Sequence, residues 1–271
     1  MANLLTKFRK PFPDRRTKQT IPGPYRCPLC NASGIDMLPL YSVFDVAMRM
    51  FFREYQKHQF IHNVFQYETF NIADHFCSNC LANDKDRLYA LYIDAMIKTT
   101  PGKTFNLLDI APTTQLTGLL KKKPEISYRS MDLYMEGVDD KADITDMHIY
   151  AEEQFDFFIC SHVLEHIPED QMAMQELYRI TKKGGGGIVM VPINFGVDVT
   201  LEDPYGMDIS ARWKYFGQDD HVRMYAKHDF IARLEAAGFK VTQLGKEHFT
   251  PEVFEKNAIY PTSVLYVVSK S

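Results

Sequence analysis

Strands and helices alternate along the last two thirds of the sequence, and this order constrains the fold more than any other feature. Strand-like apolar runs occupy residues 105–111, 126–133, 155–162, 188–193, 241–244 and 264–268. Helical patterns lie at 83–98, 116–122, 168–181 and 229–237. The run at 155–162 has a nearly continuous apolar centre, which suits a strand buried on both faces. The alternation predicts an α/β fold with a doubly wound, mostly parallel sheet. We interpret the glycines at 184–187 as the end of the third helix.

Four of the five cysteines form two Cys-x-x-Cys pairs, Cys27 with Cys30 and Cys77 with Cys80. Two residues between thiols let one tight turn direct both sulfurs at the same ion, and two such turns supply four tetrahedral ligands. The 46 residues between the pairs exceed the usual spacing. Redox pairs and a rubredoxin-like iron site remain alternatives. We favour structural Zn²⁺ because zinc is the commoner occupant of this ligand set, and because thiol pairs in a reducing cytoplasm are more often ligands than disulfides.

The segment between the pairs has its own helical pattern. Apolar residues recur at helical spacing through 41–58 and form a wide stripe. The helix could cover the main domain, line a substrate pocket or form a homodimer face, and we expect core packing. We divide the chain at 82: residues 1–82 form a basic tail and a zinc-ribbon-like module, and residues 83–271 form the main domain.

Charge and hydropathy exclude several classes of protein. The formal net charge is −4 and the pI is about 6.1, which argues against a nucleic-acid backbone as the main partner. Residues 1–20 carry six basic groups and one acidic group, which we interpret as a solvated tail. We find no apolar run long enough to span a membrane and no secretory signal. We therefore expect a cytoplasmic protein.

Acidic residues end the first two predicted strands. Asp109 lies in the first strand, and Asp132 follows 23 residues later at the end of the second. An acid at the second position can accept hydrogen bonds from both ribose hydroxyls of a nucleoside cofactor. The glycine fingerprint of dinucleotide sites is absent, since Gly118 is the only glycine between 103 and 136. This combination favours S-adenosylmethionine over NAD.

Several segments resemble class I S-adenosylmethionine-dependent methyltransferases. The stretch FDFFICSHVLEHIP at 155–168 is similar to the fourth-strand motif of that family, and residues 182–186 and 227–241 resemble later parts of it. The resemblance covers about 100–271 and implies a Rossmann-like, seven-stranded sheet. More narrowly, the chain is similar to bacterial methyltransferases with an amino-terminal cysteine module that tailor surface polysaccharides or small metabolites. The segment 216–225 resembles that group too.

The resemblance implies a role for individual residues at the cofactor site. Asp109, Ala111 and Pro112 would approach the methionine part of S-adenosylmethionine. Asp132 and Leu133 would approach its ribose. Asp143 and Ile144 would bind adenine, and Ser161 and His162 would lie beside the sulfonium and the acceptor. Pro112-Thr113-Thr114 stands where the family usually has glycines.

The acceptor is harder to identify from the sequence. Methyl transfer needs an acceptor held in line and, for an alcohol or amine, a base. His221 is our first candidate for the base and His162 the second, with His166 a third. Tyr205, Trp213, Tyr215, Arg212 and Arg223 could line an acceptor pocket. We expect a small-molecule or glycan-precursor acceptor; an RNA methyltransferase and a non-catalytic cofactor-binding partner protein are the alternatives.

Overall fold

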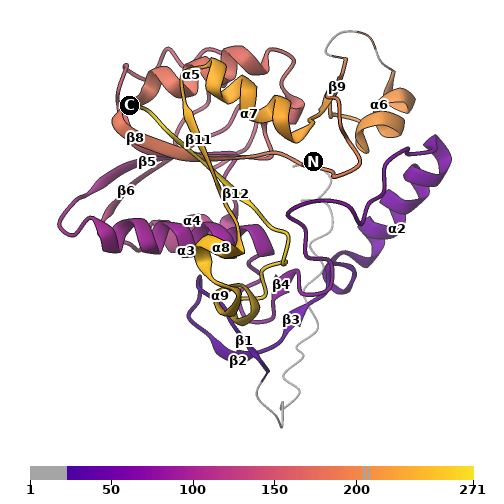
Figure 1. Cartoon of the computed structure of the whole chain (residues 1–271), viewed down its shortest axis with the longest axis horizontal. Coiled ribbons are helices and arrows are strands. Elements are labelled where there is room, and N and C mark those ends of the chain that lie inside the picture. Colours follow the sequence, from indigo (N-terminus) through magenta and orange to yellow (C-terminus); the bar gives the residue numbers. More distant parts are fainter. Residues whose placement is uncertain (1–22, 204–205, 207) are drawn as a thin grey trace.

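A computed structural model describes residues 23–203, 206 and 208–271, so the basic tail and Tyr205 lie outside the described residues. The main feature is a six-stranded sheet with the order β11-β12-β8-β7-β5-β6 (Figure 1). Its strands are β5 (Phe105–Ile110), β6 (Ile126–Met131), β7 (Phe155–Ser161), β8 (Thr181–Met190), β11 (Lys240–Leu244) and β12 (Leu265–Ser269). Strands β6, β5, β7 and β8 pair in parallel, whereas β12 is antiparallel to both of its neighbours. The predicted α/β fold with a mostly parallel sheet is confirmed.

Helices cover both faces of the sheet (Figure 1). One face is covered by α5 (Asp170–Ile180) and α7 (Lys227–Ala236), the other by α3 (Asp84–Thr99) and α4 (Thr114–Leu120). Because both faces are covered, Phe157, Phe158, Ile159 and Cys160 of β7 are all buried. The shorter elements are η2 (Leu164–His166), β9 (Leu201–Glu202), α6 (Ile209–Phe216), β10 (Arg223–Met224), α8 (Lys246–Phe249) and α9 (Pro251–Lys256). No helix among the described residues is both long and apolar enough to cross a bilayer.

The expectation of seven strands is not met by the described residues, whose central sheet has six. Beside the edge strand β6, the following segment makes one isolated parallel bridge, between Met131 and Asp140. Side chains satisfy this edge instead: Asp139 accepts hydrogen bonds from the backbone N–H and hydroxyl of Ser130, and Arg129 pairs with Asp140. The carboxylate of Asp139 thus takes up the edge N–H of Ser130, and the backbone of Asp140 bonds to the carbonyl of Ser130 and the N–H of Asp132.

The predicted role of the glycines at 184–187 is wrong. They do not end a helix but lie inside β8, which starts directly after α5. A Cβ on Gly187 would lie 2.6 Å from the ring of Phe158, and one on Gly186 would lie 2.1 Å from the carbonyl oxygen of Val268. These glycines are therefore required by the close approach of neighbouring strands, which local sequence does not reveal.

The predicted helix at 41–58 is present as α2 (Leu40–His58), but it does not pack into the core as expected. Leu40 is its buried residue, and Tyr41, Val46, Met50 and Phe52 are exposed. Figure 1 shows α2 at one side of the molecule, next to α6. Trp213 of α6 contacts the rings of Phe51 and Tyr55. The stripe residues Phe44, Phe51 and Tyr55 are partly buried, but against Phe76 and α6 and not in the main core.

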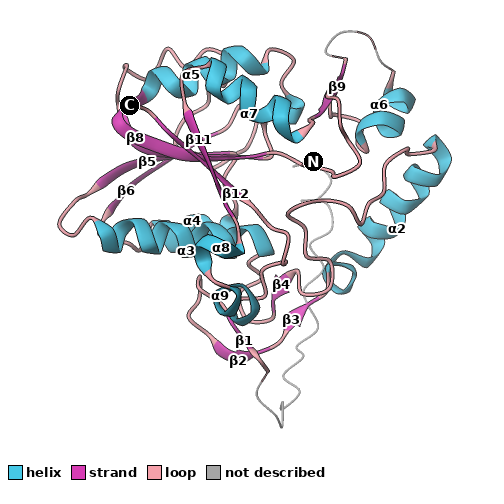
Figure 2. Cartoon of the chain, viewed as in Figure 1, coloured by secondary structure: helices cyan, strands magenta, loops and turns pink. Residues whose placement is uncertain are grey.

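The amino-terminal module contains, besides α2, four short strands at one end of the molecule, near α9 (Figure 2). The strands β1 (Tyr25–Arg26) and β2 (Ser33–Ile35) form one antiparallel pair, and β3 (Met37–Leu38) and β4 (Phe76–Cys77) form another. A small core of its own contains Cys27, Met37, Cys77, Ala82 and, from the far end of the chain, Ala258. The module is therefore packed against the carboxy-terminal part of the main domain.

A single buried arginine connects this module to the main domain. Arg87 of α3 is fully buried, and its guanidinium donates all five of its N–H groups to backbone carbonyls. The acceptors are the carbonyl oxygens of Asp74, His75, Ala82, Asn257 and Ala258, at 2.7–3.1 Å. Three of the acceptors belong to the module and two follow α9, so one side chain holds together segments about 170 residues apart in sequence.

We predict that Arg87→Met destabilises the protein by at least about 3 kcal/mol, because each buried carbonyl left without a donor costs about 1–3 kcal/mol. Urea unfolding of the two proteins measures this difference. Arg49→Met is the matched control, since the side chain of Arg49 is 78% exposed and forms a surface ion pair with Asp45 of the same helix. We expect the control to change stability by less than about 0.5 kcal/mol. Equal stability of Arg87→Met and the unmodified chain would contradict the role of Arg87.

Candidate functional site

The predicted cofactor residues meet at the carboxyl edge of the parallel sheet. Ile110 of β5 is in register with Met131 of β6 on one side and with Cys160 of β7 on the other. Residues that follow these three positions must therefore lie near one another at one edge, where α/β sheets bind ligands. They include Ala111, Asp132, Ser161 and His162, all predicted from the sequence.

The end of β5 is a tight and partly strained turn. Ala111 has a left-handed backbone, with φ of 53°, and its N–H donates to the carbonyl of Met131. Pro112 follows, and Thr113 caps α4. Asp109 is buried, accepts a hydrogen bond from the hydroxyl of Tyr128 at 2.9 Å, and has its pKa raised to about 7 by burial. Asp109 thus stays behind the turn, inside the sheet.

Asp132 lies at the end of β6, partly exposed, in a turn that fixes its carboxylate. Its Oδ1 accepts the backbone N–H groups of Tyr134 at 2.7 Å and Met135 at 2.6 Å. Leu133 is 43% exposed beside it. This Asx-type turn holds the acid at the edge of the sheet without burying it.

Asp143 and Ile144 lie in the connection between β6 and β7. Asp143 is exposed, and its Oδ1 accepts hydrogen bonds from the N–H and the hydroxyl of Thr145 at 2.8 Å. The side chain of Ile144 is buried in the main core. Only the backbone of Ile144 is therefore placed to contact a ligand.

The first two turns of α3 bring residues to this edge that the sequence did not predict for it. The Nζ of Lys85 lies 2.8 Å from Nε2 of His162, and the hydroxyl of Tyr89 lies 2.7 Å from that of Ser161. Thr113 donates to Oδ1 of Asp86 at 3.0 Å. Oδ2 of Asp86 is buried and has no hydrogen-bond partner among the described residues. The charged start of this helix was the available signal, but such residues usually serve only as helix caps.

Burial shifts the pKa values of Lys85 and Asp86 in the direction that favours their neutral forms. It raises the pKa of Asp86 to about 6, where the hydroxyl of Thr113 and the charge of Lys85 act in the opposite direction. It also lowers the pKa of Lys85, against the attraction of Asp84 and Glu165. Perturbed groups of this kind, next to an unpaired carboxylate oxygen, are typical of ligand sites.

His162 directly follows β7, and both of its ring nitrogens have a partner. Its backbone is left-handed, with φ of 56°, and its N–H donates to the carbonyl of Met190. Its Nδ1 lies 3.1 Å from Oε1 of Glu165, a residue that is 1% exposed. Burial opposes ionisation of Glu165, but the hydrogen bond from His162 and the nearby imidazoles hold its pKa at about 2. Glu165 is therefore a carboxylate that orients His162, rather than the helix cap that its position suggests.

His221 lies in the same neighbourhood but deeper. Its ring meets that of His166 edge to face, with centroids 4.6 Å apart, and it is 3% exposed. Burial lowers the pKa of His221 to about 4. Arg223, predicted for an acceptor pocket, is also buried and donates to Glu202 and to the carbonyls of 164, 167 and 168. Arg223 therefore has a structural role. The ring of Trp213 packs against that of Phe51 in α2.

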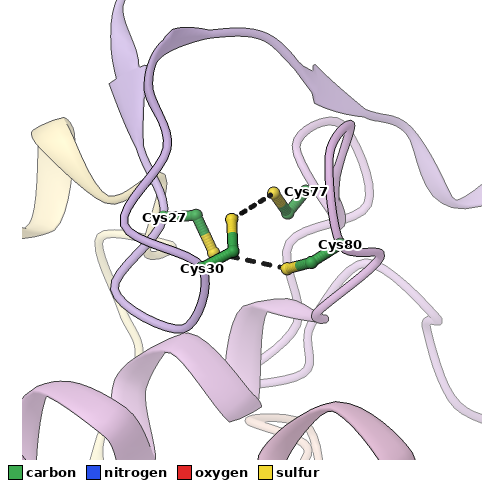
Figure 3. A group of neighbouring side chains, drawn as sticks. All are labelled: Cys27, Cys30, Cys77 and Cys80. Atoms are coloured by element: carbon green, nitrogen blue, oxygen red, sulfur yellow. Dashed lines mark hydrogen bonds between the residues drawn. The ribbon is translucent and has the colours of Figure 1, made fainter. Parts of the chain in front are cut away.

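The four cysteines of the two pairs lie together in the amino-terminal module, as Figure 3 shows. The four Sγ atoms all lie within 4.8 Å of one another. The Sγ of Cys27 lies 3.7 Å from that of Cys80, and the Sγ of Cys30 lies 3.9 Å from that of Cys77. Four sulfurs bound tetrahedrally at about 2.3 Å from one ion lie about 3.8 Å apart. The cluster therefore fits a tetrahedral metal ion.

The two cysteine turns have the same backbone design. In each, the N–H of the first cysteine donates to the carbonyl of an alanine five residues on, Cys27 to Ala32 and Cys77 to Ala82. The residue after the second cysteine is left-handed in both, with φ of 59° at Asn31 and 63° at Leu81. The fifth cysteine, Cys160, is buried in β7 and is not part of the cluster.

Comparison with known proteins identifies the family. Residues 49–244 match the family model described as a methyltransferase domain. No curated protein shows a significant similarity to the sequence.

Solved structures with a similar chain include the CurJ carbon methyltransferase, with 14% identity and a TM-score of 0.46 over 69% of this chain and 54% of that one. A SAM dependent methyltransferase from Archaeoglobus fulgidus has 14% identity and a TM-score of 0.44, over 70% and 95% of the two chains. A possible histamine N-methyltransferase from Thermotoga maritima has 17% identity and a TM-score of 0.41, over 86% of this chain and 100% of that one. The family match spans more than half of the chain, which therefore belongs to the methyltransferase-domain family and is an S-adenosylmethionine-dependent methyltransferase.

Proposed function

We propose that the chain transfers a methyl group to an oxygen or nitrogen of a small polar acceptor, such as a sugar or a phosphorylated metabolite used in surface-polysaccharide tailoring. The observation that carries this proposal is the His162–Glu165 pair at the carboxyl end of β7, on the same sheet edge as Asp132. A histidine oriented by a buried carboxylate is suited to accept a proton from a hydroxyl or amine.

The residues at the sheet edge fit S-adenosylmethionine. The sulfonium of this cofactor makes its methyl group electrophilic. Asp132 would accept hydrogen bonds from the ribose hydroxyls, and Asp143 and the backbone at Ile144 would bind the adenine. The orphaned Oδ2 of Asp86 offers an acceptor for the ammonium group of the methionine part, next to the turn at Ala111. In that role Asp86 replaces part of the backbone contact that glycines would allow.

The geometry favours His162 over His221 as the base. The side chain of His162 is 29% exposed at the strand end, whereas His221 is 3% exposed and cannot reach a bound acceptor without rearrangement. With Nδ1 donating to Glu165, Nε2 of His162 carries the lone pair that accepts the proton. Lys85, 2.8 Å from that nitrogen, would have to move or exchange its proton as the acceptor enters. The prediction that His221 is the base is open to the same experiment.

We propose that the four cysteines bind one structural Zn²⁺. Their sulfur separations match those of a tetrahedral site, and four protein ligands leave no position for a substrate. The ion would tie the turn before β2 to the turn that leads into α3. It would therefore stabilise the helix whose first turn carries Lys85 and Asp86.

Asp132→Ala should weaken the binding of S-adenosylmethionine at least tenfold. Each lost hydrogen bond to a charged group is worth about 1.5–3 kcal/mol, and about 1.4 kcal/mol is a factor of ten. Isothermal titration calorimetry with the cofactor measures this. Asp146→Ala is the control, because Asp146 is an exposed carboxylate in the same connection whose side chain lies near His148. A folded Asp132→Ala protein with undiminished affinity would refute the ribose contact.

The zinc proposal predicts about one zinc ion per chain in freshly purified, unchelated protein. Cys27→Ser should lose this ion, because three thiolates and a hydroxyl are a much poorer ligand set. Elemental analysis by plasma mass spectrometry provides the count. Cys160→Ala is the matched control and should retain zinc, since Cys160 lies in β7. Zinc-free wild-type protein, or zinc retained in full by Cys27→Ser, would rule the site out.

For catalysis, His162→Ala should slow turnover by about 10²–10⁴-fold while the cofactor still binds. Turnover is measured as S-adenosylhomocysteine release with a panel of sugars and phosphorylated metabolites. Glu165→Gln keeps a hydrogen-bond acceptor for Nδ1 but removes the charge, so we expect a smaller loss. If His162→Ala is as active as the unmodified enzyme on an accepted substrate and His221→Ala is slow, the base is His221.

A further inference from the structure

A second group of metal-ligating side chains lies away from the cysteines. Glu165 and His166 come from η2, and His221 comes from the segment just before β10. One ligand atom of each, a carboxylate oxygen or an imidazole nitrogen, lies within 4.8 Å of the others. The two segments are fixed to each other by a backbone hydrogen bond of 2.9 Å from the N–H of Val222 to the carbonyl of Glu165. The group is therefore held by rigid backbone.

Two atoms of this group are buried without a partner. Oε2 of Glu165 and Nδ1 of His221 make no hydrogen bond among the described residues, although their side chains are 1% and 3% exposed. Buried polar atoms are normally satisfied, because an unpaired one costs free energy. The other oxygen of Glu165 is already engaged by His162. A carboxylate and an imidazole from one close group, each with a buried atom that lacks a partner, form an arrangement that a cation would satisfy.

The surroundings support a metal ion in two further ways. The Nδ1 of His166 lies 3.5 Å from Oδ2 of Asp220, and outer carboxylates of this kind commonly orient ligating histidines. The side chain of His166 is 27% exposed, so the group is connected to solvent and an ion has a path of entry.

We propose that Glu165, His166 and His221 bind one divalent transition-metal ion, separate from the ion at the cysteines. Two imidazoles and one carboxylate suit ions such as Zn²⁺, Co²⁺, Fe²⁺ or Mn²⁺ and have no thiolate preference. Three protein ligands leave at least one coordination position open, in contrast to the closed cysteine cluster. Because Glu165 also contacts His162, the ion would lie next to the proposed base. The inference concerns metal binding and does not depend on the proposed methyl acceptor.

Cobalt titration of the full chain tests this proposal. After one equivalent of Zn²⁺ per chain has been added to fill the cysteines, Co²⁺ should bind at one further equivalent. It should give visible d–d absorption bands without the near-ultraviolet band that arises from charge transfer between sulfur and cobalt. His221→Ala and Glu165→Gln should each weaken Co²⁺ binding at least tenfold. His148→Ala is the control and should bind normally, because the side chain of His148 is 75% exposed, lies 3.3 Å from Asp146 and is not part of the group.

Circular dichroism and cofactor calorimetry on each variant show whether it is folded. If Glu165→Gln does not fold, His166→Ala takes its place, since His166 is partly exposed. Absence of any Co²⁺ binding beyond the cysteines would overturn the proposal, as would full binding in folded His221→Ala. Sulfur charge transfer on Co²⁺ addition would place the ion at the cysteines and would also overturn it. Failure of the methyltransferase assignment would appear separately, as a loss of cofactor binding by the unmodified chain.

Discussion

The parallel pairing of β7 with β5 and β8 is the constraint on which the candidate site depends. It places the residues after β5, β6 and β7 at one edge of the sheet, where Asp132 and His162 can serve one ligand. The pairing in turn requires Gly187, because any side chain there would collide with the ring of Phe158. Packing in the middle of the sheet therefore sets the positions of groups at its edge, and catalytic geometry follows from core geometry.

The first turn of α3 couples the cysteine cluster to the cofactor edge. Ala82 belongs to the second cysteine turn, and Asn83 caps the helix that begins at the next residue. Within that helix, Arg87 holds the module while Lys85 and Asp86 face the ends of β5 and β7. A metal ion at the cysteines would thus stabilise the cofactor site through one turn of helix, without contacting a ligand itself.

Glu165 lies close to His162 and also to the pair His166 and His221. Oε1 accepts from His162 at the strand end, and Oε2 has no hydrogen-bond partner among the described residues, while one carboxylate oxygen lies within 4.8 Å of a ring nitrogen of His166 and of His221. Its burial would be costly for an isolated carboxylate, and the nearby imidazoles compensate for that cost. The same residue therefore links the proposed proton acceptor to the proposed metal ion, so that a change at Glu165 affects both.

The sequence by itself determined the features that depend on local pattern: the order of strands and helices, the two cysteine pairs and the acid at the end of β6. Each is written in residues close together in the chain, through apolar periodicity or fixed spacing. Tertiary structure alone decided which five carbonyls surround Arg87 and which carboxylate binds at the edge of β6. It also decided the exposure of α2 and the proximity of Glu165 to His221. Most of these are contacts between distant segments, and the others depend on which neighbours a segment meets. Such contacts are selected by burial and by the need to satisfy buried polar groups, which have no local signature.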